Sequence, residues 1–278
     1  MNTRTLYQNL SAKSIVAATR EQNLSRLMDH MRDIAPDIVD QYTYGIDPEE
    51  YARYWETKMR ALHAFQVNST LDALATLDRD DLVVVDIGDS SGTHGEYLRG
   101  LAPSGRISRF VSVNLDPVAV EKIRRRGGEA VLIRAEELEL DDIAPDFLMC
   151  FETLEHLTDP LRFLHRLANN PYGENLIVSV PYRRRSRFGG SVLDRPIDSI
   201  PLKMTPEELH IFELCPADWS RMSMLAGYRT EFCRVYRQYP RFGPLRAMAP
   251  VWRNIDFEGF ICLFLKRDSS VSRRYTGW

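Results

Sequence analysis

The sequence has few cysteines and no CxxC pair among them. Its four cysteines are spread over 278 residues, and three of them fall in apolar segments, a pattern typical of reduced thiols rather than of a disulfide framework. The chain also lacks a long hydrophobic run, since LVVVDIG and GFICLFL have only the length of strands and are too short to span a bilayer. The stretch MNTRTLYQNLSAKS has no apolar segment behind its positive charges, so no signal peptide is expected. These absences predict a cytoplasmic protein without a membrane partner.

The chain has little excess charge of either sign. Its formal net charge is −3 at pH 7, so nothing in the composition as a whole points to nucleic acid or to an anionic membrane. Hydrophobic residues make up 44% of the sequence, which suffices for the core of one large domain. No internal repeat or low-complexity tract interrupts it. We therefore expect one domain with an extension.

Two parts of the chain, residues 1–80 and 81–278, differ in their hydrophobic pattern. The first part predicts several helices, one of which starts at Asp47-Pro48 and has an apolar face along YARYWETKMRALHAFQ. This extension either packs on the main domain or covers a substrate pocket as a lid. In the second part, short apolar runs alternate with helical stretches that start near Thr93, Pro117, Glu136 and Asp159. The predicted strands are 82–87, 109–114, 130–134, 146–151, 175–180, and two more within 228–239 and 259–267. This order predicts an α/β Rossmann-like fold with a seven-stranded, mostly parallel sheet.

The segment VVVDIGDSSGTHGEYL (83–98) predicts a strand, a tight turn and a helix. Gly88 and Gly92 permit the bend, and the small Ser90 lets a ligand approach the backbone at the carboxyl end of the strand. The GxGxxG dinucleotide pattern is absent, and any strand-to-helix turn favours glycine and serine. The next strand ends in VNLDP, where Asn114 can hydrogen-bond a ribose diol and Asp116 fits the cap of the following helix. The pattern indicates a nucleotide-like ligand.

The segment CFETLEHLTDP places three ionisable side chains just after a predicted buried strand. Glu155 and His156 lie three and four positions after Glu152, which puts all three on one side of a helical turn. Two carboxylates and an imidazole at that spacing form a plausible half-site for a divalent metal. Alternatively, Glu152 is stabilised by a helix N-terminus, and His156 acts as a cap or as a general base.

These segments, with LIRAEELEL, PDFLMCFETLEHLTDPLRFLHRLA and LIVSVPY, resemble the class I S-adenosylmethionine-dependent methyltransferases over roughly residues 80–267. The resemblance implies a site for S-adenosylmethionine around the glycine turn. The residues that it assigns to the cofactor are Asp86, Gly88, Ser90, Gly92, Asn114, Ala135, Glu136 and Phe151. Ser90 replaces the middle glycine of the family motif, Asn114 its ribose-binding acid, and Arg134 its usual aspartate. A cofactor-binding or regulatory relative without catalysis is therefore an alternative.

A later histidine, His210 in EELHIFEL, extends the resemblance to two metal-dependent groups. The Glu-x-x-Glu-His element is similar to the O-methyltransferases of ubiquinone biosynthesis, and the His-x-Phe-Glu context is similar to the RNA 3′-terminal 2′-O-methyltransferases. The metal ligands that this implies are Glu152, Glu155, His156 and His210. Oxygen and imidazole ligands suit Mg²⁺, Mn²⁺, Fe²⁺, Co²⁺ or Zn²⁺. Without a metal, His156 or His210 would be the catalytic base.

The segment PYRRRSRF follows the fifth predicted strand, where this architecture places substrate loops. Its arginines, which suit phosphate or carboxylate groups unless they only form a solvated surface, are Arg183, Arg184, Arg185 and Arg187. The sequence thus predicts methyl transfer to an oxygen of a small-molecule or sugar acceptor, and the arginines would suit an acceptor that carries anionic groups. Methylation of an RNA 3′ end is the alternative, although a near-neutral chain lacks the broad basic surface that RNA binding favours.

Overall fold

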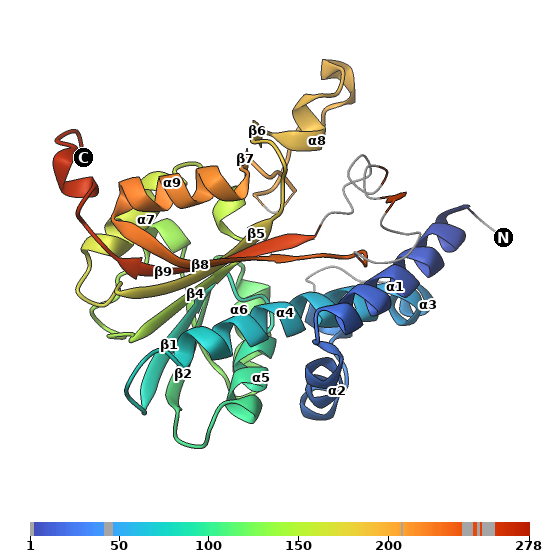
Figure 1. Cartoon of the computed structure of the whole chain (residues 1–278), viewed down its shortest axis with the longest axis horizontal. Helices are drawn as coiled ribbons and strands as arrows, with labels where there is room; N and C mark the ends of the chain where they lie inside the picture. Colours follow the sequence, from blue (N-terminus) through green and yellow to red (C-terminus); the bar gives the residue numbers. More distant parts are fainter. Residues whose placement is uncertain (1–2, 42–46, 207, 241–246, 249–250, 252–258) are drawn as a thin grey trace.

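A computed structural model describes residues 3–41, 47–206, 208–240, 247–248, 251 and 259–278 of the chain. Its centre is a seven-stranded sheet in the order β3-β2-β1-β4-β5-β9-β8 (Figure 1). The strands are β1 (Leu82–Ile87), β2 (Ile107–Asn114), β3 (Glu129–Leu132), β4 (Phe147–Phe151), β5 (Asn175–Pro181), β8 (Tyr228–Tyr236) and β9 (Phe260–Arg267). Strands β1 to β5 pair in parallel, whereas β9 runs antiparallel to both β5 and β8. The predicted Rossmann-like fold is confirmed.

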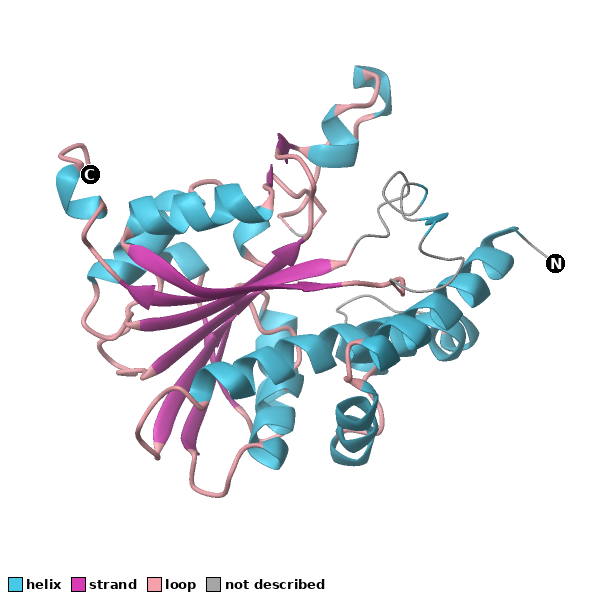
Figure 2. Cartoon of the chain, viewed as in Figure 1, coloured by secondary structure: helices cyan, strands magenta, loops and turns pink. Residues whose placement is uncertain are grey.

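Helices cover both faces of the sheet (Figure 2). One face carries α1 (Thr3–Glu21), α2 (Ser25–Ile34), α4 (Glu56–Leu74) and α5 (Thr93–Leu101), and the other carries α7 (Pro160–Asn169) and α9 (Pro216–Ala226). Successive strand residues point to opposite faces, so Val84 packs with the first layer and Val85 with the second. Burial on both faces explains why the strands are continuous apolar runs.

The N-terminal helices are fastened to the sheet domain by a buried arginine. Arg60 of α4 is 0% exposed, forms an ion pair with Glu56, and donates to Tyr97 Oη of α5 at 3.1 Å and to the Pro36 carbonyl at 2.6 Å. Asp47 caps α3 (Pro48–Glu50) by accepting from the backbone of Glu49 and Glu50, as the sequence predicts. The extension is therefore packed on the sheet, and α4 runs along it.

One predicted helix and one predicted helical turn differ from the structure. Residues Ala135–Glu137 form a single 3-10 turn instead of a helix, because Leu138 and Leu140 face the core at a spacing of two and not at the helical period. Leu154–His156 is also a 3-10 turn, and Glu152 before it has a φ of 49°. By contrast, α5, α6 (Pro117–Arg125) and α7 begin at or next to the predicted positions.

The cysteines fall into three environments. Cys150 and Cys262 are buried in the sheet, Cys215 is half-buried and Cys233 is exposed, and all four are free thiols.

Among the helices that the structure describes, none has both the length and the apolar character that crossing a bilayer requires.

Candidate functional site

A cavity of about 550 Å³ opens at the carboxyl ends of the parallel strands, between the sheet and α4. This is where the strand order reverses between β1 and β4, the place at which open α/β sheets bind ligands. The predicted site residues that line it are Asp86, Gly88, Ser90, Asn114, Phe151, Glu152, His156, Arg183 and His210. Those outside its lining are Gly92, Ala135, Glu136, Glu155, Arg184, Arg185 and Arg187. One hollow thus joins most of the predicted cofactor residues to both histidines.

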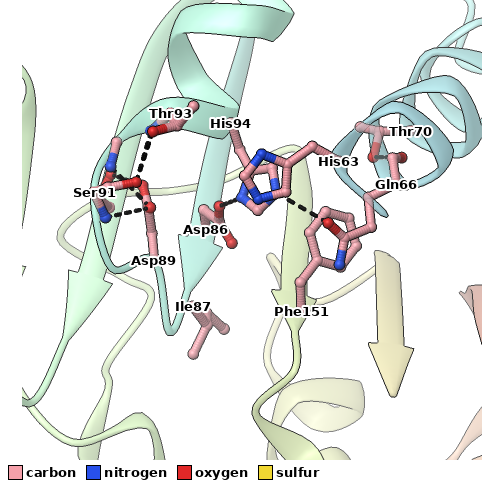
Figure 3. Close-up of polar contacts among 12 residues, drawn as sticks. His63, Gln66, Thr70, Asp86, Ile87, Asp89, Ser91, Thr93, His94 and Phe151 are labelled. Atoms are coloured by element: carbon pink, nitrogen blue, oxygen red, sulfur yellow. Dashed lines mark hydrogen bonds and ion pairs between the residues drawn. The ribbon is translucent and has the colours of Figure 1, made fainter. Parts of the chain in front are cut away.

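The glycine turn after β1 is held by a carboxylate that the sequence analysis did not single out. Asp89 Oδ1 accepts from the backbone N–H group of Ser91 at 3.1 Å (Figure 3). It also accepts from the backbone N–H group of Gly92 at 2.9 Å, and Oδ2 accepts from the Ser112 hydroxyl at 2.6 Å. Gly88 has a φ of 94°, and a Cβ there would lie 2.0 Å from Thr153 Oγ1. The turn therefore requires glycine at position 88, and Asp89 fixes its shape.

The residues beyond the turn have mixed roles. Asn114 lines the cavity, but its amide donates to the Asp89 carbonyl at 2.9 Å and its carbonyl accepts from the Asp116 N–H at 2.8 Å. Asp116 caps α6 through Val118 N, as predicted. Gly92 is the N-cap of α5, and Glu136 forms an ion pair with Arg134 at 3.3 Å. Ala135 and Glu136, which the resemblance assigned to the cofactor, do not line the cavity.

The structure brings Glu155, His156 and His210 together. One ligand atom from each lies within 4.8 Å of the others, and the two imidazole rings meet edge-on with centroids 4.7 Å apart. Glu152 lines the same cavity but lies outside this group, because the left-handed backbone at Glu152 takes it out of the helical turn that the spacing suggested. Its Oε1 instead accepts from the Ser179 hydroxyl at 2.7 Å.

Glu155 is the least satisfied side chain of the cluster. It is 0% exposed, and neither carboxylate oxygen has a hydrogen-bond partner within the described structure. Burial, together with the nearby charge of Glu152, raises the pKa of Glu155 well above its ordinary value. An unsatisfied buried carboxylate beside two imidazoles has the donor chemistry of a divalent-cation site, so these residues fit such an ion.

The tautomer of His156 also fits the role of a ligand to a divalent cation. Its Nδ1 lies 3.1 Å from the Leu209 carbonyl oxygen, to which only an N–H can donate. In the neutral ring this leaves the lone pair on Nε2, which lies 3.9 Å from Glu155 Oε1. A backbone carbonyl behind the ring is a usual way of orienting a metal-ligating or basic histidine.

A second acidic cluster lies at the other end of the cavity. Asp86, Asp89 and His94 also offer ligand atoms within 4.8 Å of one another. Here the oxygens of Asp89 already accept three hydrogen bonds, and Asp86 Oδ2 lies 3.1 Å from His94 Nδ1. The cluster is satisfied by the protein itself, unlike the group around Glu155.

Helix α4 supplies a polar wall that the sequence analysis missed. Lys58, His63 and Gln66 all line the cavity. Burial lowers the pKa of His63 well below its ordinary value, with His94 and Arg60 adding to the shift. Burial also lowers the pKa of Lys58, although the charge of Glu152 acts in the opposite direction. The predicted apolar face of this helix identified its packing, but no local signal marks which polar residues face a distant strand end.

The arginine segment is divided between the cavity and the solvent. Arg183 and Arg187 both bind the buried Glu213, with Nε to carboxylate distances of 2.7 Å each, beside the small hairpin of β6 (Arg187–Phe188) and β7 (Phe212–Glu213). Arg184 and Arg185 are exposed. Of the four arginines, only Arg183 lines the cavity.

Glu213→Gln is expected to destabilise the protein near neutral pH, because hydrogen bonds to charged groups are worth about 1.5–3 kcal/mol each. Burial opposes ionisation, but Arg187 and Arg183 outweigh it and lower the pKa of Glu213 below 4.5. The advantage of the wild type over the variant is therefore full above about pH 4.5 and is lost as the pH falls through the lower folded pKa. Urea unfolding at pH 7 and pH 3 measures this, and an equal difference at both pH values would contradict the ion-pair account.

Comparison with known proteins agrees with this geometry. Residues 85–169 match the family model of a methyltransferase domain. The chain shares 13% identity and a TM-score of 0.54 with a putative sarcosine dimethylglycine methyltransferase from Galdieria sulphuraria, covering 88% of this chain and 98% of that one. It shares 17% identity and a TM-score of 0.52 with a chain from the complex of the Haloferax volcanii Trm112 methyltransferase activator and a putative methyltransferase, covering 79% and 96%. A [4+2]-cyclase, SpnF, has the same fold at 14% identity and a TM-score of 0.53, covering 91% and 97%.

No curated protein matches the chain. At these identities the solved structures establish the fold, and the family match covers the glycine turn, the LEHLTDP segment and α7. Fold, matched segment and cavity agree with one another. Residues 85–169 thus match a methyltransferase domain, and the chain has the Rossmann-like fold of the methyltransferases to which it is similar.

Proposed function

We propose that this protein transfers a methyl group from S-adenosylmethionine to a hydroxyl oxygen of a small anionic acceptor, with the help of a divalent cation. The observation that carries the proposal is the unsatisfied buried carboxylate of Glu155 behind His156 and His210, two histidines that line the same cavity as the glycine turn. The chemistry needs a hydroxyl placed in line with the methyl donor.

The cofactor end of the cavity is built from the glycine turn and the end of β2. Asp86, Gly88, Ser90 and Asn114 line the cavity there, and Phe151 lines the same cavity with its ring centroid 5.1 Å from that of His94. The serine at position 90 leaves the turn open to a ligand, because the bend itself depends on Gly88 and on the carboxylate of Asp89. We therefore expect Ser90 and Asn114 to permit cofactor binding.

At the other end, Glu155, His156 and His210 would hold the cation, with Glu152 close by on the cavity wall. Mg²⁺, Mn²⁺, Fe²⁺, Co²⁺ and Zn²⁺ all suit oxygen and imidazole donors. When bound, such a cation lowers the pKa of an acceptor hydroxyl and fixes its position. The Leu209 carbonyl orients His156, and Glu152, held by Ser179, places a carboxylate beside the acceptor. The Glu152 carboxylate can take up the hydroxyl proton while the oxygen forms its bond to the methyl carbon and the bond from that carbon to the cofactor sulfur breaks.

Acceptor recognition depends on the cations that face the cavity. Lys58 lines it, and its ammonium lies 4.8 Å from the Trp55 ring centroid, with no ion pair to a carboxylate among the described residues. Arg183 adds a second positive charge, and Tyr182 and Phe260 form an apolar wall. This combination favours a hydroxylated ring or chain that carries a carboxylate or a phosphate.

Lys58→Met is expected to raise the KM for the acceptor by about tenfold, since a charge-assisted contact is worth about 1.5–3 kcal/mol, and to leave the affinity for the cofactor unchanged. The matched control is Arg184→Met, which removes an exposed charge outside the cavity lining. Steady-state kinetics on the best acceptor measures both variants. Equal KM values for Lys58→Met and the wild type would contradict the proposal that the acceptor is anionic.

The proposed function is tested by following transfer of a radiolabelled methyl group onto hydroxylated carboxylates, sugar phosphates and an RNA oligonucleotide with a free 3′ end. We expect product from a small anionic hydroxy compound, and loss of product when EDTA is added. Product from the RNA alone would favour the 3′-end reaction instead. Methylation that is indifferent to EDTA and to added metal would remove the cation from the proposal.

A further inference from the structure

His94, the second residue of α5, bridges two segments that are distant in sequence. Its Nδ1 lies 3.1 Å from Asp86 Oδ2 at the end of β1, and its Nε2 lies 3.2 Å from Gln66 Oε1 in α4 (Figure 3). The Gln66 amide nitrogen donates to Ser179 Oγ at 2.7 Å, which leaves the Gln66 carbonyl oxygen facing the ring. Asp86 and Gln66 are each 1% exposed, so water does not compete for these contacts.

The two partners of His94 determine how many protons its ring carries. A carboxylate oxygen and an amide carbonyl oxygen are both acceptors, so each hydrogen bond needs an N–H from the ring. A neutral imidazole has one N–H, whereas the imidazolium has two. While Asp86 is ionised, both contacts are therefore made at once only when His94 is a cation.

The charged groups around His94 agree with this count. Burial disfavours the charged ring, but Asp86, Asp89 and Glu152 outweigh it and raise the pKa of His94 above 6.5. From α4 the ring faces His63, whose centroid is 4.8 Å away and whose pKa is lowered, so His63 is neutral near pH 7. Burial also raises the pKa of Asp86, and it raises the pKa of Glu152 to about 8, so the Asp86 and Asp89 carboxylates are the groups that favour a charged His94 near pH 7.

We propose that His94 is a positioning residue: as a buried imidazolium at neutral pH, it ties Gln66 of α4 to Asp86 at the cofactor turn. Helix α4 is then part of the cofactor site rather than a separate cover, because the same ring that orients Asp86 also holds the helix in place. Above the pKa of His94 one of the two contacts is lost, and with it the stability that the raised pKa provides. The inference rests on the proposed function only in placing the cofactor at the Asp86 end of the cavity.

Nitrogen-15 NMR of imidazole-labelled protein tests the protonation directly. The chain has six histidines, and the His94 signals are assigned by their loss in His94→Phe, or by their shift in the Gln66 variants if that variant does not fold. We expect both ring nitrogens of His94 to show the protonated shift at pH 7, with titration above pH 6.5. A single neutral tautomer at pH 7 would overturn the proposal.

Gln66 variants provide a readout that a purely structural role would not change. Gln66→Glu keeps an acceptor for Nε2–H and adds a negative charge, so the pKa of His94 is expected to rise. Gln66→Leu removes the acceptor, so the pKa is expected to fall below that of the wild type. If neither substitution moves the His94 titration, the bridge to α4 does not exist.

Calorimetry with S-adenosylhomocysteine connects the bridge to the cofactor. His94→Phe keeps the ring volume and removes both donors, and we expect it to weaken binding by about tenfold or more, since it leaves the buried Asp86 without its donor. The control is His165→Phe, whose ring stacks on Trp278 outside the cavity. Unchanged affinity in a folded His94→Phe, or in Gln66→Leu if the former does not fold, would overturn the positioning role. Absence of binding by the wild type would instead overturn the proposed cofactor site, while the NMR titrations still decide the state of His94.

Discussion

Glu155→Gln is expected to abolish metal-dependent methyl transfer without destabilising the metal-free protein. The substitution keeps the shape of a side chain that is 0% exposed and removes the negative charge that a cation requires. Loss of an outer-shell partner alone costs about 10–100-fold in metal affinity, so loss of a direct ligand should cost at least about 100-fold. Isothermal titration with Mn²⁺ or Zn²⁺, together with kcat/KM at saturating metal, measures the effect.

The stability of the metal-free protein sharpens this test. Burial raises the pKa of Glu155, so ionising it in the folded state is unfavourable, and the wild type pays this cost increasingly as the pH rises above 4.5. Glu155→Gln has no such cost, and its unfolding temperature without metal should equal or exceed that of the wild type at pH 8. Glu139→Gln is the matched control, because that side chain is 69% exposed. A variant that keeps the metal-induced rise in unfolding temperature would contradict the assignment.

Gly88→Ala is expected to cost about 2–5 kcal/mol of unfolding free energy and to remove cofactor binding. The backbone there has a φ of 94°, which costs a side-chain-bearing residue about 1–2 kcal/mol. In addition, the new Cβ would lie 2.0 Å from Thr153 Oγ1, and overpacking of this kind costs about 1–3 kcal/mol. Chemical denaturation and calorimetry with S-adenosylhomocysteine measure the two effects.

Gly105→Ala separates the cost of the backbone conformation from the cost of the steric overlap with Thr153. Gly105 has a similar φ of 78°, but no atom lies within 4 Å of its ideal Cβ position. We expect this variant to lose only the backbone contribution, about 1–2 kcal/mol, and to bind the cofactor like the wild type. Equal losses in the two variants would show that Thr153 yields and that the turn tolerates a side chain.

The sequence predicted what neighbouring residues determine. The continuous apolar runs set the strands, and the turn from Asp86 to Gly92 follows from glycine and serine at the end of β1. Asp116 and Asp47 cap helices because an acidic residue directly before proline is a local signal. The pairing of His156 with His210 was reached through resemblance, and their 4.7 Å ring separation now places them in one group.

What the sequence did not predict depends on contacts between distant segments. The spacing of Glu152 and Glu155 suggested a helical turn, but the positive φ at Glu152 turns the two carboxylates to different surroundings. Lys58 and Gln66 reach the cavity only because α4 lies across the strand ends. In the sequence they stand 20 or more residues before Asp86, the first strand residue of the cavity lining. Four arginines in one segment looked equivalent, yet the buried Glu213 engages two of them.

A crystal structure of the complex with S-adenosylhomocysteine and Mn²⁺, recorded with anomalous scattering from the metal, tests the central claim most directly. The account predicts an anomalous peak in contact with Glu155, His156 and His210, and a cofactor whose sulfur faces that peak across the cavity from Gly88. A peak at Asp86 and Asp89 with none between the two histidines, or a cofactor bound outside this cavity, would contradict it.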